Sequence, residues 1–363
     1  TPPLPAVAIS QPGDVWILDR HRVMCGDSTN PGAVATLMAG QAAALLHADP
    51  PYGMGKENDG VANDNLYGEN LDEFQMRWWR AFRPSMDSNA SIYIWGNAPG
   101  LWRLWWNNLY GSERLTIRNE IAWHKANGGF GIGTAAQRCY FPTERCLFFM
   151  LGEQGFNTNA DNYWEGYEGI RTALAADVEK MGWGPKDIER ICGVGMYSHW
   201  FGKSQWTLIP EVHYKKLQAA ARDHDAFKRD HDAFKRDHDE IKRDHDEIKR
   251  EFYATRAYFD NTHDNMTDVW QFSPVIGDDR HGHATPKPVA MIERVMRSSL
   301  PPGGLCAEPF GGSGSTLIAA ETTGRACYLM ELQPKYCDLT IRRWQAFTGK
   351  TATHAVTGAA FPG

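Results

Sequence analysis

The chain has 363 residues, of which 42% are apolar and 14 are Trp, so it can bury a substantial core in one large domain with an insertion or in two domains. No apolar run reaches the roughly 18 residues that span a bilayer and no signal peptide is visible, so we expect a cytoplasmic protein rather than a membrane protein. The formal net charge of −6 at pH 7 excludes a globally basic nucleic-acid coat, but it leaves room for a local basic groove.

Periodicity in the first 160 residues predicts strands that alternate with helices. Helices are expected from a cap near Asn30 and over residues 71–82, and strands over 42–48, 90–96, 120–125 and 145–151. The polar stretch 53–69 is rich in Gly and Asn, which predicts a long mobile loop. The alternation predicts an α/β fold, with a mostly parallel sheet and helices on both faces.

Seven cysteines are spread along the chain without a CxxC pair or a zinc-like spacing with histidine. We expect them to be buried as small apolar residues in a reducing compartment, and we expect no metal site.

The middle of the chain has a different pattern. Residues 185–206 contain an apolar helix, a turn with Gly193 and Gly195, and a second short helix, which together resemble a helix-turn-helix. Two short helices that meet at a glycine also occur in ordinary packing, and that interpretation stays open. If the segment reads DNA, the contacts are expected from Tyr197, Ser198, His199, Lys203, Ser204 and Gln205. A local excess of eight Lys and Arg over five Asp and Glu in residues 171–222 favours phosphate contacts.

Four heptads follow in residues 223–250, each with an Asp-His-Asp start and a Lys-Arg end. Phe227 and its three counterparts alternate with histidines at a 3–4 spacing, which is typical of a coiled-coil seam. We therefore expect a heptad helix over 215–255, paired within the chain or between two chains. A solvated single helix is an alternative, and a metal-binding histidine ladder is disfavoured because only Asp accompanies the imidazoles.

The tetrad Asp49-Pro50-Pro51-Tyr52 directly follows the buried strand expected over 42–48. Proline cannot continue a sheet, and a carboxylate at the end of a strand needs a partner or a cavity. Taken alone, the stretch predicts no more than a turn with a capping Asp.

A second motif lies near the far end, in residues 305–331. A strand over 305–307 ends in Glu308, a glycine turn precedes a helix that starts at Ser315, and a strand over 326–330 ends in Glu331. This is the layout of a nucleotide-type binding crevice, in which glycines let the backbone approach a ligand and the second acid suits a ribose diol.

Together, D-P-P-Y at 49–52, H-A-T-P-K-P at 283–288 and E-P-F-G-G-S-G at 308–314 resemble the amino-group DNA methyltransferases, and their order is that of the β class. The resemblance covers residues 12–160 and 275–347. It implies a Rossmann-like methyltransferase sheet with helices on both faces and a circularly permuted motif order. It also implies S-adenosylmethionine as cofactor, double-stranded DNA as substrate, and a homodimer. The insertion 161–274 takes the place of the mainly helical target recognition region, and 348–363 are expected as a C-terminal tail.

The resemblance also assigns roles to single residues. It implies that the chemistry is carried by Asp49, Pro50, Pro51 and Tyr52. It puts the adenine of the cofactor near Asp27, its ribose near Glu331, and its carboxylate near Thr285 and Lys287. The whole expected cofactor set is Asp27, Thr285, Lys287, Glu308, Phe310, Gly311, Gly312, Ser313, Gly314, Ser315 and Glu331. Glu308 stands where the family usually has Asp.

An exocyclic amino group is a poor nucleophile because its lone pair is delocalised into the base. A carboxylate at Asp49 and the carbonyl of Pro50 would accept its two N–H groups and localise that lone pair, while Tyr52 offers a face for a base flipped out of the duplex.

In this family D-P-P-Y is associated mostly with adenine N6, so we expect a site-specific adenine methyltransferase of bacterial or phage origin. Cytosine N4, a catalytically silent DNA-binding regulator on the same fold, and an RNA or protein substrate remain alternatives. The chain has no Pro-Cys pair, which excludes cytosine C5 chemistry.

Overall fold

The computed structural model describes residues 2–57, 61–106, 115–125, 143–152, 168–203, 206–222, 224–230, 256–262, 266–275 and 286–362. The chain forms two compact units. The first unit comprises Thr1–Gln154 and Thr255–Gly363, and the second comprises Gly155–Ala254.

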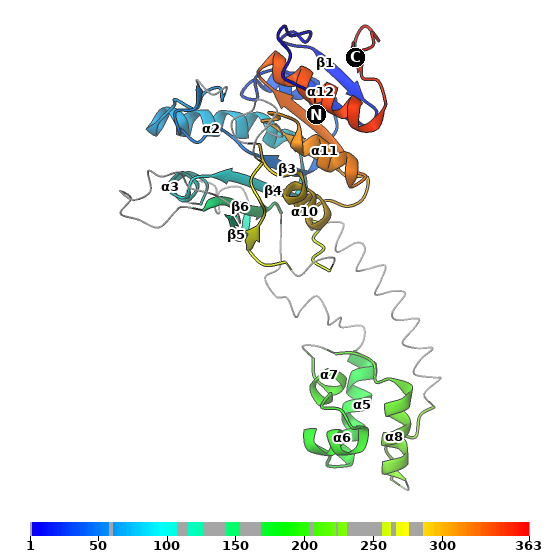
Figure 1. Ribbon diagram of the computed structural model, residues 1–363. Helices are drawn as coiled ribbons and strands as arrows, with labels where there is room; N and C mark the ends of the chain where they lie inside the picture. The colour runs from blue at the N-terminus through cyan, green and yellow to red at the C-terminus, as the bar shows by residue number, and fades with distance from the viewer. Residues whose placement is uncertain are drawn as a thin grey trace. The chain divides into compact units, whose positions relative to one another are not determined.

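The first unit is built on a ten-stranded sheet with the order β10-β1-β2-β9-β8-β3-β4-β6-β5-β7 (Figure 1). Its strands are β1 Val15–Leu18, β2 His21–Cys25, β3 Ala43–Ala48, β4 Met86–Gly96, β5 Thr116–His124, β6 Glu144–Met150, β7 Val269–Gln271, β8 Leu305–Glu308, β9 Ala326–Glu331 and β10 Thr353–His354. The six strands predicted from periodicity and from the second motif are confirmed as β3, β4, β5, β6, β8 and β9.

The central strands β2, β9, β8, β3 and β4 run parallel to one another. The flanks differ, because β1 runs antiparallel to β2 and β10, and β6 runs antiparallel to β4 and β5. The prediction of a mostly parallel sheet is thus right for the centre and wrong for the flanks. At β1 the reason is its connection to β2, which consists of Asp19 and Arg20 alone. Such a short turn can join only antiparallel strands.

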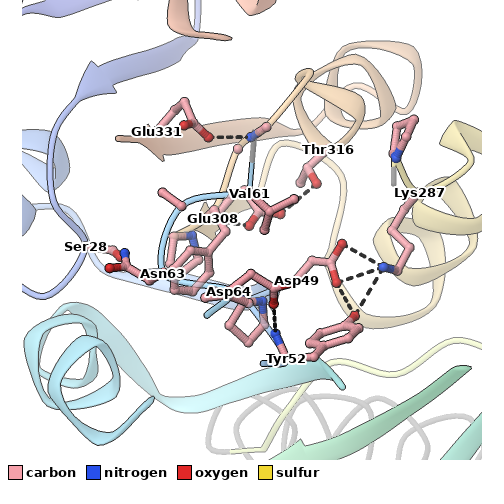
Figure 2. Close-up of a pocket in the computed structure, with 18 of the residues that line it drawn as sticks. Ser28, Asp49, Tyr52, Val61, Asn63, Asp64, Lys287, Glu308, Thr316 and Glu331 are labelled. Carbon is pink, nitrogen blue, oxygen red and sulfur yellow. Dashed lines mark hydrogen bonds and ion pairs between the residues drawn. The ribbon is translucent and has the colours of Figure 1, made fainter. Parts of the chain in front are cut away.

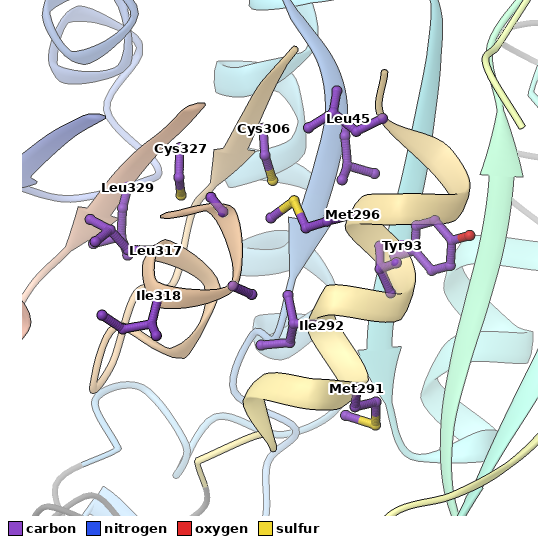
Figure 3. Packing of buried hydrophobic residues seen from close by; sticks show 14 of the residues in the cluster. Leu45, Tyr93, Met291, Ile292, Met296, Cys306, Leu317, Ile318, Cys327 and Leu329 are labelled. Carbon is purple, nitrogen blue, oxygen red and sulfur yellow. The ribbon is translucent and has the colours of Figure 1, made fainter. Parts of the chain in front are cut away.

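Helices cover both faces of this sheet. They are α1 Pro31–Met38, α2 Gly68–Phe82, α10 Val289–Ser299, α11 Ser315–Thr322 and α12 Pro334–Thr348, with short turns η2 Arg83–Ser85, α3 Ala98–Gly100 and the π-helical η3 Leu101–Trp106. Successive strand residues point to opposite faces. Leu45 and Cys306 pack with α10 and α11 (Figure 3), whereas their neighbours Leu46 and Ala307 pack with α1 and α2. The predicted helices near Asn30 and over 71–82 are confirmed, and the Asn30 side chain caps α1 by accepting from the backbone N–H of Gly32 and Ala33.

The strand order reverses between β3 and β8. From β8 the chain passes through α11 to β9 on one side, whereas from β3 it passes through α2 to β4 on the other. In a parallel sheet, such a switch point leaves a crevice outside the carboxyl ends of the two strands. Asp49 and Glu308 stand at these two ends, which brings the two sequence motifs together.

The second unit consists of α5 Glu168–Lys180, α6 Pro185–Cys192, α7 Tyr197–Phe201 and α8 Glu211–Ala221 within the residues that are described. Its buried side chains include Leu174, Ile188, Trp200 and Leu217. The two short helices predicted in 185–206 are confirmed as α6 and α7. Gly193 ends α6 with φ 79°, a left-handed conformation that glycine adopts without strain.

The heptad helix predicted over 215–255 is helical over 215–221 and is wrong for the described residues that follow. Helix α8 ends at Ala221, Arg222 has φ 41°, and residues 224–230 form bends. Phe227 is buried against Trp183 and Tyr214 with ring centroids 5.7 and 5.9 Å away. Burying this ring in the core of the unit outweighs continuing the helix. Residue 223 and residues 231–250, which make up the other three heptads apart from Asp230, lie outside the described residues.

Two predicted boundaries also differ. Residues 348–363 were expected as a tail, but β10 pairs with β1, and Phe361 is buried with its ring 4.9 Å from that of Trp16. Residues 266–274 were assigned to the insertion, but β7 pairs with β5 and Trp270 packs in the core of the first unit. Burial of these aromatic side chains ties both segments to the sheet.

Six cysteines, at positions 25, 146, 192, 306, 327 and 337, are buried and unpaired as predicted, and Cys139 lies outside the described residues. In the described part of the chain, no helix combines the length and the apolar character needed to cross a membrane.

Candidate active site

A cavity of about 420 Å³ opens at the switch point between β3 and β8 (Figure 2). The predicted residues that line it are Asp27, Asp49, Pro50, Pro51, Tyr52, Lys287, Glu308, Phe310, Gly311, Gly312, Ser313, Ser315 and Glu331. Gly314 lies in the same turn without lining the cavity, and Thr285 lies outside the described residues. The structure therefore brings the tetrad and the glycine turn, 250 residues apart in sequence, to one cavity.

Asp49 is held by an ammonium group. Lys287 Nζ donates to both carboxylate oxygens of Asp49, at 2.8 and 2.7 Å, and lies 3.2 Å from the hydroxyl of Tyr52, which itself donates to Asp49 (Figure 2). Burial raises the pKa of Tyr52 well above its usual range, and the nearby carboxylates of Asp49 and Glu144 raise it further. Tyr52 is therefore a hydrogen-bond donor to Asp49 throughout the physiological pH range.

Glu144 on β6 completes this cluster. Its carboxylate lies 3.1 Å from Lys287 Nζ and pairs with Lys125 on its other oxygen. Burial by itself would lower the pKa of Lys287, but the carboxylates of Asp49 and Glu144 raise it above its ordinary value. Lys287 is thus a permanently charged side chain, only 5% exposed, between two acids.

The backbone carbonyls of the tetrad differ in their partners. The Gln75 amide donates to the carbonyl of Pro51 at 2.9 Å, and the Asn97 amide donates to that of Tyr52 at 3.1 Å. Among the described residues, none donates to the carbonyl of Pro50. These two amides fix the course of the tetrad and leave the Pro50 carbonyl beside the cavity as an acceptor.

Asp64 organises the segment after the tetrad. Its carboxylate, 3% exposed, accepts hydrogen bonds from the backbone N–H groups of Tyr52, Gly53 and Lys56 at 2.8–2.9 Å. Gly53 has φ 73°, and a Cβ at this position would lie 2.6 Å from the carbonyl oxygen of Leu66. The expectation of a mobile loop over 53–69 is therefore wrong for the described residues around Asp64, because a buried carboxylate that accepts three N–H groups fixes their backbone.

The glycine turn passes close to the core. A Cβ on Gly311 would lie 2.2 Å from the side chain of Leu329, and Gly314 has φ 80° with Thr340 2.8 Å from its Cβ position. Phe310 packs edge-to-face on Trp78 of α2, with ring centroids 5.4 Å apart. These contacts require glycine at both positions, because a Cβ would meet Leu329 or Thr340.

Glu331 lies across from the turn. One carboxylate oxygen accepts from the N–H of Gly312 and the other from that of Gln333, each at 2.8 Å. Burial raises its pKa to about 7, although both backbone N–H groups oppose the shift. Asp27 stands on the same side of the cavity, exposed, with one oxygen accepting from Thr29.

Glu308 is 1% exposed and bound to protein groups. It accepts from the N–H of Phe310 at 3.0 Å, from the hydroxyl of Thr316 at 2.7 Å and from His47 Nδ1 at 2.8 Å. Because the indole of Trp95 donates to His47 Nε2, the ring hydrogen of His47 lies on Nδ1 and is donated to Glu308. The extra methylene relative to Asp lets this carboxylate join β8, the glycine turn and β3.

The residues predicted to contact DNA lie in the second unit. Ser198 is exposed on α7, Tyr197 and His199 are partly exposed, and Lys203 is 67% exposed with its Nζ 3.5 Å from Glu168. Ser204 and Gln205 lie outside the described residues.

Sequence reasoning missed His47, Asp64, Gln75 and Glu144. His47, Asp64 and Gln75 lie in stretches predicted only as a strand, a loop and a helix, and Glu144 directly precedes a predicted strand. Only the folded sheet shows what these side chains contact. His47 carried one usable signal, since it is a polar residue inside a strand expected to be buried.

A switch-point cavity that joins a glycine turn to an Asp-Pro-Pro-Tyr tetrad is the arrangement expected of a methylase that acts on amino groups. Residues 43–342 match the family described as DNA methylase, and the chain belongs to that family.

Two relatives match shorter stretches. The Type II methyltransferase M.ScaI of Streptomyces caespitosus is 36% identical over 88 residues, which are 23% of this chain and 29% of that protein. The DNA adenine methyltransferase YhdJ of Escherichia coli (strain K12) is 34% identical over 77 residues, which are 21% of this chain and 26% of that protein. The aligned stretches thus span less than a third of either relative. Among solved structures, the M1.HpyAVI–SAM complex is 12% identical with a TM-score of 0.46, over 88% of this chain and 98% of that one.

Proposed function

We propose that the protein transfers a methyl group from S-adenosylmethionine to the N6 amino group of an adenine flipped out of double-stranded DNA, at a specific sequence. The observation that carries the proposal is the pair of acceptors at one cavity, the Asp49 carboxylate and the Pro50 carbonyl, with Gly311 and Gly312 of the glycine turn in the lining of the same cavity. Membership of the DNA methylase family agrees with this assignment.

The cavity fits the cofactor in three respects. Glycine at 311 and 314 lets the turn pack directly on Leu329 and Thr340, and Gly311 and Gly312 lie in the lining of the cavity. Glu331 provides carboxylate oxygens for a ribose diol, and Asp27 lies on the same side for the adenine. When bound, the cofactor supplies an electrophilic methyl group on a sulfonium.

The residues of the tetrad act on the amino group. Asp49 and the carbonyl of Pro50 accept its two N–H bonds, which localises the nitrogen lone pair towards the methyl group. Gln75 and Asn97 hold the adjoining carbonyls and thereby fix the direction of the Pro50 carbonyl. Such pre-positioned acceptors stabilise the transition state without reorganising as the charge develops.

Adenine is proposed over cytosine because the tetrad begins with Asp, and because the relative YhdJ is named a DNA adenine methyltransferase. Cytosine N4 presents the same kind of amino group and is the second candidate. The second unit is proposed to recognise the target sequence, through α7 and the residues that follow it. A homodimer, as the β-class resemblance implies, is part of the proposal.

The test measures transfer of labelled methyl groups to duplex DNA, RNA and protein in parallel. We expect transfer to duplex DNA alone, and an Asp49→Asn variant with its rate reduced by about 10³-fold or more, because one acceptor becomes a donor. An inactive wild-type protein that still binds DNA would favour the silent regulator. Transfer to RNA or protein would contradict the substrate.

A further inference from the structure

Lys287 lines the cavity, and the sequence resemblance implies a place for it near the cofactor carboxylate. In the structure its ammonium binds both oxygens of Asp49 and lies near the hydroxyl of Tyr52 (Figure 2). The proposed reaction needs an oxygen of Asp49 for the amino group of the base. Oδ1 of Asp49 accepts from both Lys287 and Tyr52, and Oδ2 accepts from Lys287, so Lys287 competes with the substrate amine for these oxygens.

The surroundings of Lys287 explain why it is held there. Its Nζ lies 5.5 Å from the ring centre of Tyr52, 5.4 Å from that of Trp95 and 6.0 Å from that of Trp123. Aromatic faces stabilise a cation that has lost its water, so the site is built for a buried ammonium. Glu144, 3.1 Å away, gives it a second anion on the side opposite Asp49.

On the basis of the proposed function, we propose that Lys287 is a positioning residue that acts through Asp49. It orients the Asp49 carboxylate before substrate binds, and it yields an Asp49 oxygen to the incoming amino group by shifting its hydrogen bonds towards Glu144. No bond to Lys287 forms or breaks during methyl transfer. Because Asp49 and Glu144 are both anions, the Lys287 ammonium has a charged partner whether it lies nearer to one or to the other.

The titratable groups that face Asp49 come from four segments. Tyr52 lies on the same loop, Lys287 precedes α10, Glu144 and Cys146 lie on β6, and Lys125 follows β5. Burial raises the pKa of the Cys146 thiol well above its ordinary value, and Tyr52 also stays protonated, so neither provides a charge. Lys287 is the cation in direct contact with Asp49 among the described residues, which makes the orientation of Asp49 sensitive to its removal.

The experiment compares Lys287→Gln with Lys125→Gln in the full-length protein. Lys125 is a matched control because it pairs with the same Glu144 but is not bonded to Asp49. Two quantities are measured for each: the affinity for S-adenosylmethionine by calorimetry, and the single-turnover rate of methyl transfer at pH 7. Thermal unfolding checks that each variant is folded.

For Lys287→Gln we expect an affinity for the cofactor within about twofold of wild type and a rate at pH 7 at least tenfold lower, roughly the loss of one charge-assisted contact. The loss should fall on the rate and not on the cofactor affinity, because the Asp49 carboxylate loses the contact that orients it. Lys287→Arg should restore most of the rate at pH 7, and Lys125→Gln should keep a rate within about twofold of wild type.

Glu144→Gln provides an independent variant if Lys287→Gln does not fold. Removing the second anion should hold Lys287 on Asp49, so the KM for DNA rises several-fold while the cofactor affinity stays unchanged. The inference is overturned if Lys287→Gln loses cofactor affinity in proportion to its loss of rate, or if its rate matches wild type. A wild-type protein that binds the cofactor but transfers no methyl group would instead refute the proposed function.

Discussion

At the scale of single residues, Glu331 is the group whose charge changes near neutral pH. Burial raises its pKa to about 7, so the folded protein binds a proton that the unfolded chain has already lost. Its contribution to stability is therefore greatest at acidic pH and is lost as the pH rises from the unfolded value towards 7. Folding thus favours the protonated form of Glu331, whereas a ribose diol that donates hydrogen bonds to this carboxylate favours the ionised form.

We predict that cofactor affinity rises by about tenfold between pH 6 and pH 8 through Glu331 alone, as its carboxyl ionises. Calorimetric titration of wild type and Glu331→Gln across this range isolates the effect, since the amino group of the cofactor titrates equally in both experiments. If the cofactor affinities of the two proteins change with pH in parallel, Glu331 does not bind the ribose.

Glu308 makes a separate prediction about stability. Replacing it with Gln turns one acceptor oxygen into an NH2 group that faces the N–H of His47 and the hydroxyl of Thr316. We expect the free energy of unfolding to fall by about 1–3 kcal/mol, the cost of leaving a buried donor without an acceptor. Urea unfolding measures this change in the free energy of unfolding. Glu73→Gln, at an exposed position, is the matched control. Equal midpoints for the two variants would contradict the role given to Glu308.

The individual contacts of the site were only partly predictable. Asp49, Glu308 and Glu331 could be placed because each ends a strand of a recognised pattern. Lys287 could be expected at the site but not on Asp49, since its partner lies 238 residues away. Asp64 stood in a polar stretch where any of several residues could have accepted the same N–H groups.

At the scale of elements, the glycine turn between β8 and α11 depends on its closeness to β9. We predict that Gly311→Ala lowers both cofactor affinity and the free energy of unfolding, the latter by about 1–3 kcal/mol, because the new Cβ forces Leu329 out of its packed position. Gly169→Ala is the control, since nothing lies within 4 Å of a Cβ there. If Gly311→Ala keeps wild-type affinity and stability, the turn can accommodate a Cβ and the prediction is wrong.

Most elements of the first unit followed from the sequence. Hydrophobic runs that end in an acid or a glycine turn located β3, β8 and β9, and the amphipathic pattern located α2. The antiparallel flanks were not predictable from alternation alone, because the direction of β1 depends on a two-residue turn and that of β6 on its pairing with β4 and β5.

At the scale of the whole molecule, the repeat was the least predictable part. Four near-identical heptads favour one continuous helix, yet the first copy turns back and buries Phe227 in the second unit. The reason is tertiary: Trp183 and Tyr214 offer that ring a core, which no local pattern in the repeat reveals.

The proposed homodimer can be tested on the repeat without disturbing this core. A variant lacking residues 230–250 removes three copies and keeps Phe227 in place. If the later heptads pair between chains, we expect sedimentation to show a dimer for wild type and a monomer for the variant. An unchanged mass would exclude the repeat from the interface.

The most direct test of the central proposal is single-molecule sequencing of DNA from cells that express the wild-type protein or Asp49→Ala. We predict N6-methyladenine at one sequence motif with the wild type and none with the variant. The same mark in both strains would contradict the role of Asp49, and N4-methylcytosine in its place would contradict the choice of base. No mark with the wild type would contradict DNA methylation itself.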